Sequence, residues 1–153
     1  MNNSNQITNL MMTHHGLIMS LLSFLKDTLN LPPEKYPEVV NSFEKFKWEL
    51  EKHIFAEERV IFKAWSKEDS EISKIIQDLI KNHSKMLEAL DTICDNLAPN
   101  YQFSLDKFET LLKEHASIEE TVLYPKLDKV LGDKEKTNII KKIDEIPLRK
   151  TVR

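Results

Sequence analysis

The chain has 153 residues, of which 41% are hydrophobic and 31% are charged, and this composition is typical of a globular protein rather than a disordered one. It contains only two glycines, which disfavours a sheet protein with glycine-rich turns and favours a mostly helical fold. The formal net charge of −3 gives no reason to expect nucleic acid or an anionic membrane as a partner.

The N-terminal segment MNNSNQITNL lacks the basic and long apolar regions of a secretory signal peptide. Further along the chain, no apolar run approaches the length of a membrane-spanning helix. Cys94 is the single cysteine, which excludes an intramolecular disulfide and a multi-cysteine zinc site. We therefore expect a cytoplasmic protein with no membrane partner.

Four segments show the apolar spacing of amphipathic helices, in which steps of four and three residues alternate. In chain order, the four stripes are Met11, His15, Ile18, Leu22, Leu25 and Leu29; Phe43, Phe46, Leu50, His53, Glu57, Val60 and Ala64; Ile72, Ile76, Leu79, His83, Met86, Leu90, Ile93 and Leu97; and Leu105, Phe108, Leu112, His115, Glu119 and Val122. Each stripe predicts one helix with a buried face.

Prolines and capping residues mark the boundaries of these helices. Pro32, Pro33 and Pro37 separate the first helix from the second, and Asp69 or Ser70 can cap the third. These signals predict separate helices joined by short connections.

The fourth helix has its own start and stop signals. Ser104 can cap it, and Pro125 is expected to kink it or to end its regular part. Gly132 is placed to terminate a short extension, and Asp133 can start a short fifth helix. The tail LRKTVR after Pro147 is expected to be frayed and solvated.

Because the connections are short, neighbouring helices should be antiparallel. The sequence therefore predicts an all-α fold, an antiparallel up-down-up-down four-helix bundle with a short C-terminal helix. We expect a single domain over residues 1–153, with the bundle over about 5–131 and the short helix and tail over 133–153.

Each stripe places one histidine at a core position, and two stripes also place a glutamate there, where a carboxylate is costly to bury. In chain order these residues are His15, His53, Glu57, His83, His115 and Glu119. The histidines lie at similar chain distances from the turns between them, so they should reach one level along the bundle.

An internal repeat supports this arrangement. The stretch HIFAEERVIF at 53–62 matches HASIEETVLY at 115–124 in its histidine, its glutamate pair, and its valine, aliphatic and aromatic ending. The first and third stripes also superpose, which pairs His15 with His83. A helical hairpin is therefore used twice.

Four imidazoles and two carboxylates in a dry core would be strongly destabilising without a partner. Six ligands are too many for one tetrahedral zinc and suit a pair of metal ions bridged by the two carboxylates. Imidazole with carboxylate favours iron or manganese over calcium or magnesium, and di-iron sites are known inside four-helix bundles. The alternative is a helical interaction domain whose core histidines bind no metal.

Three polar neighbours remain beside this set. His14 is expected at the edge of the site or in solvent, although it could exchange roles with His15. Glu58 and Glu120 lie five residues after their histidines, about 140° around a regular helix. They are therefore expected to face outward, either as solvated surface or as outer neighbours of the ligands, and their replacement by alanine should leave metal binding and stability unchanged.

The motifs THHGLI, HIFAEERVIF, NHSKM and HASIEETVLYP together resemble those of the hemerythrin-like, or HHE cation-binding, family over about residues 5–131. The resemblance implies two non-haem iron ions, bridged by Glu57 and Glu119 and by an oxo or hydroxo group. It also implies that His15 and His53 bind one iron and that His83 and His115 bind the other.

The chain departs from the oxygen-carrying members of that family. Those have a second histidine on the third helix, whereas Leu79 and Leu87 flank His83 here. They also use an aspartate at the +5 position of the fourth helix, where this chain has Glu120. Ile54 stands where some sensor-type relatives have an acid. Coordination positions could therefore be open on both irons.

The leading hypothesis is a protein that binds or senses dioxygen or another diatomic ligand. The alternatives are an oxidoreductase acting on hydrogen peroxide or nitric oxide, and a protein that handles or repairs iron centres. An unidentified redox or protein partner is compatible with each of them.

Overall fold

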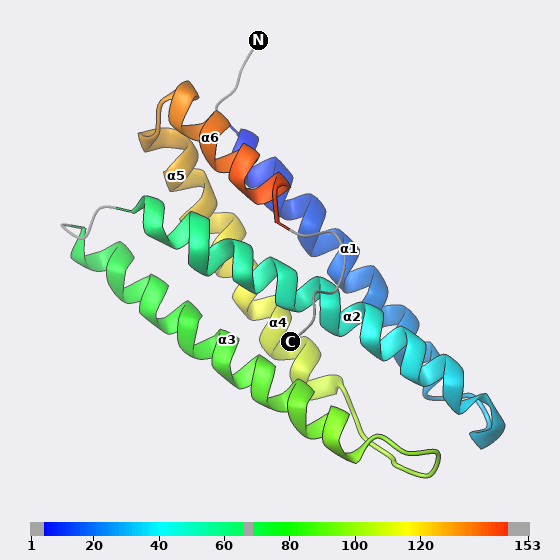
Figure 1. Ribbon diagram of the computed structural model, residues 1–153. Coiled ribbons are helices and arrows are strands. Elements are labelled where there is room, and N and C mark those ends of the chain that lie inside the picture. The colour runs from blue at the N-terminus through cyan, green and yellow to red at the C-terminus, as the bar shows by residue number, and fades with distance from the viewer. Residues whose placement is uncertain (1–4, 66–68, 147–153) are drawn as a thin grey trace.

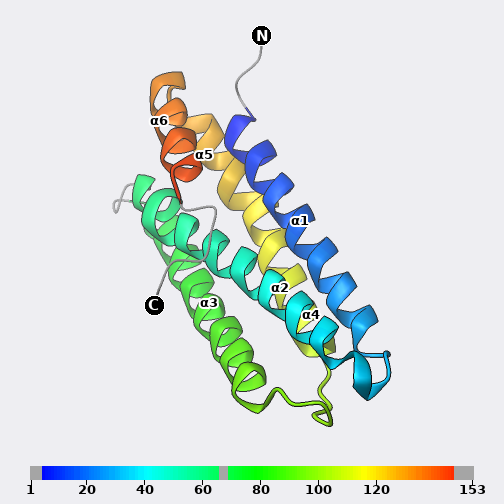
Figure 2. The same ribbon diagram turned by 45° about the vertical axis from the view of Figure 1, so that its right-hand side comes forward.

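The structure, a computed structural model, describes residues 5–65 and 69–146. These residues form helices and no strands, so the expected all-helical fold is confirmed. The long helices lie side by side along a common direction, as Figures 1 and 2 show. The helices are α1 (Gln6–Thr28), α2 (Tyr36–Ala56), α3 (Ser70–Asn96), α4 (Asp106–Ile118), α5 (Tyr124–Val130) and α6 (Asp133–Asp144). Short turns of other helix types are η1 (Pro33–Lys35), η2 (Glu57–Ile61), η3 (Phe62–Ala64) and η4 (Glu119–Leu123).

Within the described ranges, no helix combines the length and the apolar character needed to cross a bilayer.

The helix starts follow the capping residues of the sequence. At the start of α3, the Asp69 carboxylate accepts a hydrogen bond from the N–H of Ile72 at 3.0 Å, as expected. Ser104 stands one residue before the cap of α4, and its hydroxyl accepts a hydrogen bond from the N–H of Asp106 at 3.2 Å. Such bonds satisfy N–H groups that have no partner within the helix.

The short C-terminal helix is present where it was expected. It begins at Asp133, directly after Gly132, and the Glu135 carboxylate accepts a hydrogen bond from the N–H of Gly132 at 3.3 Å. The tail after Pro147 lies outside the described residues.

A polar layer divides the apolar core of the bundle into two clusters. Along α1, His15 lies between Met11 of one cluster and Ile18 of the other. The same order recurs at His83 on α3. Apolar packing on both sides therefore holds the histidine level in place and keeps bulk water away from it.

Two π-helical turns, η2 and η4, come after the histidines of α2 and α4 at equivalent places in the internal repeat. Because hydrogen bonds in such a turn run from residue i to residue i+5, the turn holds an extra residue and shifts the helical phase of the residues after it. Val122, expected in the buried stripe, is 40% exposed, and Leu123 is fully buried in its place. Ile61 replaces Val60 in the same way. The stripe prediction is wrong here because it assumed uninterrupted α-helical periodicity.

The fourth helix is interrupted as expected, but ahead of Pro125 rather than at it. The π-helical turn η4 comes first, and Pro125 then occupies the first turn of α5. Pro125 has no N–H to continue the α-helical hydrogen-bond pattern, and the π-helical turn directly before it is where that regular pattern is already interrupted.

Asp128 of α5 connects α5 and α6 to the start of α1 through hydrogen bonds and an ion pair. Its buried carboxylate accepts hydrogen bonds from the N–H of Ile7 at 2.9 Å and from the N–H of Thr8 at 2.8 Å. It also accepts the hydroxyl hydrogen of Thr8 at 2.6 Å, and the Lys136 ammonium of α6 lies 3.7 Å away. This end of the bundle is therefore held together by a buried polar network.

Candidate metal centre

The structure brings together all six side chains that the sequence placed in the core. They come from α1, α2, η2, α3, α4 and η4, and every one of them is buried. Their ligand atoms form two sets, in each of which all atoms lie within 4.8 Å of one another. One set is His15, His53, Glu57 and Glu119; the other is Glu57, His83, His115 and Glu119. Both glutamates belong to both sets, so the two sets share one continuous polar space.

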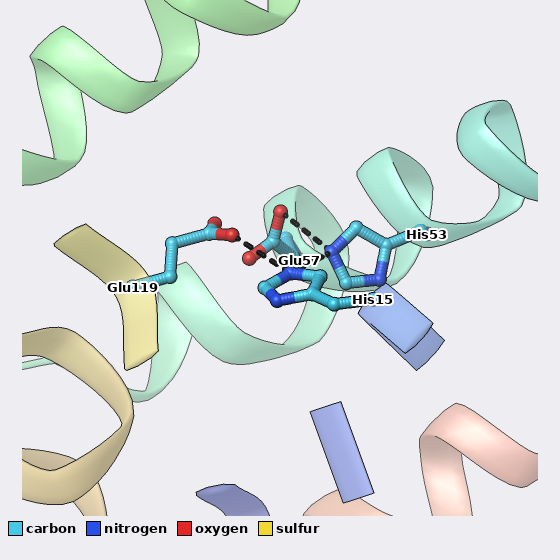
Figure 3. A group of neighbouring side chains, drawn as sticks. All are labelled: His15, His53, Glu57 and Glu119. Atoms are coloured by element: carbon cyan, nitrogen blue, oxygen red, sulfur yellow. Dashed lines mark hydrogen bonds and ion pairs between the residues drawn. The ribbon is translucent and has the colours of Figure 1, made fainter. Parts of the chain in front are cut away.

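Within each set, two imidazoles face each other through their Nε2 atoms. The Nε2 atoms of His15 and His53 are 3.1 Å apart, and Figure 3 shows these rings turned toward Glu57 and Glu119. The Nε2 atoms of His83 and His115 are also 3.1 Å apart. Since one proton at most fits between two such nitrogens, each pair directs at least one lone pair into the centre.

The two glutamates lie between the imidazole pairs in different ways. Glu119 approaches one pair with each oxygen: Oε1 is 3.1 Å from His15 Nε2, and Oε2 is 3.2 Å from His115 Nε2. Glu57 uses a single oxygen, Oε1, which is 3.3 Å from His53 Nε2 and 3.1 Å from His83 Nε2.

Two further carboxylates contact the outer nitrogens, Nδ1, of two of the four histidines. Glu120 Oε2 is 2.5 Å from His15 Nδ1, and Glu58 Oε2 is 2.7 Å from His83 Nδ1. The Glu120 side chain is 26% exposed and the Glu58 side chain 38%. The expectation of solvated side chains is therefore corrected, and the alternative, outer neighbours of the histidines, agrees with these contacts. The first expectation treated the helix as regular, whereas η2 and η4 turn both residues toward the rings of neighbouring helices.

This outer contact sets the tautomer of the two rings. In a neutral imidazole the Nδ1–H donates to the carboxylate, which leaves the Nε2 lone pair free to face the centre. The same arrangement therefore occurs twice: Glu120 contacts the outer nitrogen of His15, Glu58 contacts that of His83, and each ring faces the centre with its other nitrogen.

The other two histidines have weaker outer contacts. His115 Nδ1 is 3.4 Å from the Asn82 side-chain amide. His53 Nδ1 is buried and has no hydrogen-bond partner within the part of the chain that the structure describes. The outer nitrogens of His15 and His83 therefore have close carboxylate partners, whereas those of His115 and His53 do not.

His14 lies at the edge of the site, as the stripe phase predicted, and His15 occupies the inner position. The His14 ring is half-buried and meets the His53 ring edge-on, with centroids 5.9 Å apart. Burial, helped by the charge of His53, lowers the pKa of His14 to about 4. His14 and His53 also line a cavity of about 200 Å³ beneath α6.

Tyr124 is a site residue that the sequence reasoning missed. It is 0% exposed, and its hydroxyl donates a hydrogen bond to Glu57 Oε2 at 2.5 Å. Burial, together with the charges of Glu119 and Glu57, raises the pKa of Tyr124 well above 10, so the phenol keeps its proton. The signal was present in the repeat, which ends in an aromatic residue at both Phe62 and Tyr124.

The electrostatics of the centre favour positive charge. Burial lowers the pKa of His115, but contacts with Glu119 and Glu57 outweigh it and raise the value to about 9. Burial likewise acts to raise the pKa of Glu57, but the charge of His53 and contacts with Glu119 and His115 hold it well below its usual range. The two carboxylates thus draw protons onto the imidazoles when no other cation is present.

These donors fit metal ions. Both oxygens of Glu119 are buried, and among the described side chains neither has a partner in hydrogen-bond geometry. The contacts of these oxygens with His15 and His115 therefore stabilise the buried carboxylate incompletely, and a metal ion shared with the same imidazoles would stabilise it further. Cys94 is exposed and takes no part.

Comparison with known proteins agrees with this geometry. A family model described as the hemerythrin HHE cation binding domain matches residues 6–127, a range that contains all six inner side chains. The chain belongs to this family, as its motifs predicted. No match was found among curated proteins or solved structures.

Proposed function

We propose that the chain is a non-haem di-iron protein that binds or senses dioxygen or another small diatomic ligand. The observation that carries this proposal is the pair of donor sets that share Glu57 and Glu119. Each set offers two imidazoles and shared carboxylates, a combination that iron and manganese accept and that calcium and magnesium disfavour.

In this proposal His15 and His53 hold one iron, and His83 and His115 hold the other. Glu57 and Glu119 connect the two irons. An iron pair bound here would supply the redox chemistry and the exchangeable coordination positions, while the protein orients the imidazoles and excludes bulk water. The site is carried by one domain, an up-down-up-down bundle of a cytoplasmic protein.

A small cavity beside the site supports a diatomic ligand. The cavity of about 200 Å³ touches His53, and its apolar walls include Leu17, Ile18, Ala56 and Ile143. Its volume suits a few small molecules rather than a large substrate, although Glu49, Lys52 and Asp144 also line it.

The test is metal analysis combined with absorption spectra of the reduced protein before and after dioxygen, nitric oxide and hydrogen peroxide. The proposal predicts bound iron and a spectral change that reverses when the gas is removed. Irreversible oxidation on first exposure to dioxygen would exclude oxygen carriage. Absence of any bound transition metal would exclude the whole proposal.

An enzymatic role is the second candidate, and the surroundings of His83 favour it. The positions four residues before and after His83 on α3 are Leu79 and Leu87, so neither provides a second histidine. Leu79 is buried and Leu87 packs against the core. With fewer imidazoles, both irons would have open positions, which disproportionation of peroxide or reduction of nitric oxide at two metals could use. Turnover of either substrate above the rate of free iron would support this role, and rates equal to free iron would exclude it.

A further inference from the structure

The two halves of the internal repeat differ at one aromatic position next to the site. Phe62 stacks on His83 with ring centroids 5.7 Å apart and ring planes 10° apart. At the equivalent place in the other half, Tyr124 lies against His15 with centroids 5.8 Å apart and planes 36° apart. Both rings support a histidine, but Tyr124 alone of this pair brings a hydroxyl group.

That hydroxyl lies inside the donor cluster. It donates to Glu57 Oε2 at 2.5 Å and lies 3.4 Å from His15 Nε2. Glu57 therefore presents a single oxygen, Oε1, to His53 and His83. Glu119, in contrast, presents one oxygen to each half of the site.

We infer that Tyr124 makes the two metal positions unequal, because its hydroxyl engages the Glu57 oxygen that would otherwise serve the His15–His53 position. A carboxylate oxygen that accepts a short hydrogen bond donates less electron density to a metal. The His15–His53 position is therefore the weaker and more open of the two, and it adjoins the cavity beside His53. Tyr124 acts here as a positioning residue through Glu57.

This inference rests on the proposed metal centre, and Tyr124→Phe tests it by installing the ring already present at position 62. The wild type should bind two ferrous ions with distinct dissociation constants in anaerobic chelator competition, and iron-57 Mössbauer spectra should show two quadrupole doublets. Replacement of an outer partner changes metal affinity by roughly 10- to 100-fold, so the ratio of the two constants should fall about tenfold in Tyr124→Phe and the doublets should converge.

Tyr36→Phe is the matched control, because the Tyr36 hydroxyl donates to the carbonyl of Leu97 at 3.1 Å, away from the site. Its two constants and its spectrum should equal those of the wild type. Thermal unfolding of the metal-free proteins separates a packing effect from a positioning effect.

The outcomes are distinct. Equal constants in the wild type, or an unchanged ratio in Tyr124→Phe, would overturn the inference while leaving the metal centre intact. An equal loss of affinity at both positions with lowered stability would assign Tyr124 a packing role only and would also overturn it. A wild type that binds no transition metal would overturn the proposed function and this inference with it.

Discussion

At the scale of single residues, the centre is defined by which atoms lack ordinary partners. Glu119 is fully buried, with both oxygens between imidazoles and outside hydrogen-bond geometry among the described groups. His53 Nδ1 is similarly buried and unpaired within those residues. A buried carboxylate in this position is costly, and a bound cation would account for Glu119. It would not account for His53 Nδ1, because His53 faces the centre through Nε2.

Glu119→Gln should reduce the metal content to at most one ion per chain. The neutral amide cannot supply two anionic oxygens to two metals, and the gain in unfolding temperature on adding metal should shrink accordingly. Elemental analysis and thermal unfolding with and without chelator measure both effects. Glu114→Gln, an exposed site on α4, is the control. Full metal content with wild-type affinity in Glu119→Gln would contradict the assignment.

Glu120→Ala should weaken metal binding, in contrast to the expectation from the sequence. The His15 ring would lose the acceptor of its Nδ1 proton, and loss of such a partner costs roughly 10- to 100-fold in metal affinity. Glu120→Gln should restore part of the affinity, because its amide oxygen can still accept that proton. Chelator competition measures all three proteins. Wild-type affinity in Glu120→Ala would show that this contact is incidental.

The six inner residues could be chosen from the sequence because α1 to α4 are regular up to the histidine level. The contact of Glu120 with His15 could not be predicted, because a residue five positions after a histidine is directed away from that histidine's face on a regular α-helix, and the π-helical turn that begins at Glu119 is not visible in the hydrophobic pattern. Two adjacent glutamates at the same place in both repeats are the one signal that the sequence offered for this.

At the scale of elements, η2 and η4 decide the geometry. They place two consecutive acids so that Glu57 and Glu119 face the centre while Glu58 and Glu120 reach the outer side of rings on other helices. Beyond each turn the buried face moves by about one residue, which is why Leu123 is in the core and Val122 is not. Hydrophobic periodicity predicted the helices correctly, but it predicted the wrong buried residues after each π-helical turn.

The network at Asp128 is an element-level source of stability. Asp128→Ala would leave the N–H groups of Ile7 and Thr8 without their acceptor, and we expect the free energy of unfolding to fall by about 2–4 kcal/mol. Urea denaturation of the metal-free protein measures this change.

The control for this prediction is Asp106→Ala. Its carboxylate lies 3.7 Å from the Lys26 ammonium, and its side chain is 81% exposed, so the expected change is within about 0.5 kcal/mol. Equal changes in the free energy of unfolding of the two variants would show that the hydrogen bonds of Asp128 add no more stability than an exposed ion pair.

At the scale of the whole molecule, the polar layer joins four helices between two apolar clusters, so a metal ion bound there would link metal binding to folding. The sequence predicted this layer from the matched heights of the four histidines. It could not predict the difference between the two halves, because that depends on how the Tyr124 hydroxyl meets Glu57 in space.

The stabilisation that metal provides should increase with pH, because the metal-free protein loses a stabilising contribution of His115 as the pH rises. The His115 ring faces Glu57, Glu119 and His83, and its pKa is raised from 6.5 to about 9 on folding. This contribution to the metal-free protein is complete below pH 6.5 and is lost as the pH rises through about 9. Metal requires the neutral ring, so the gain in unfolding temperature on adding metal should be larger at pH 9 than at pH 6.5. Thermal unfolding at both pH values measures it, and an equal or smaller gain at the higher pH would refute it.

The proposed centre has two metal positions built from six side chains, of which Glu57 and Glu119 belong to both positions. Anaerobic titration of the metal-free protein with ferrous iron tests it most directly, with His53→Ala as the companion variant. We predict saturation at two ions per chain in the wild type and a lower stoichiometry in His53→Ala. Saturation at one ion, or no binding at all, in the folded wild type would contradict the account.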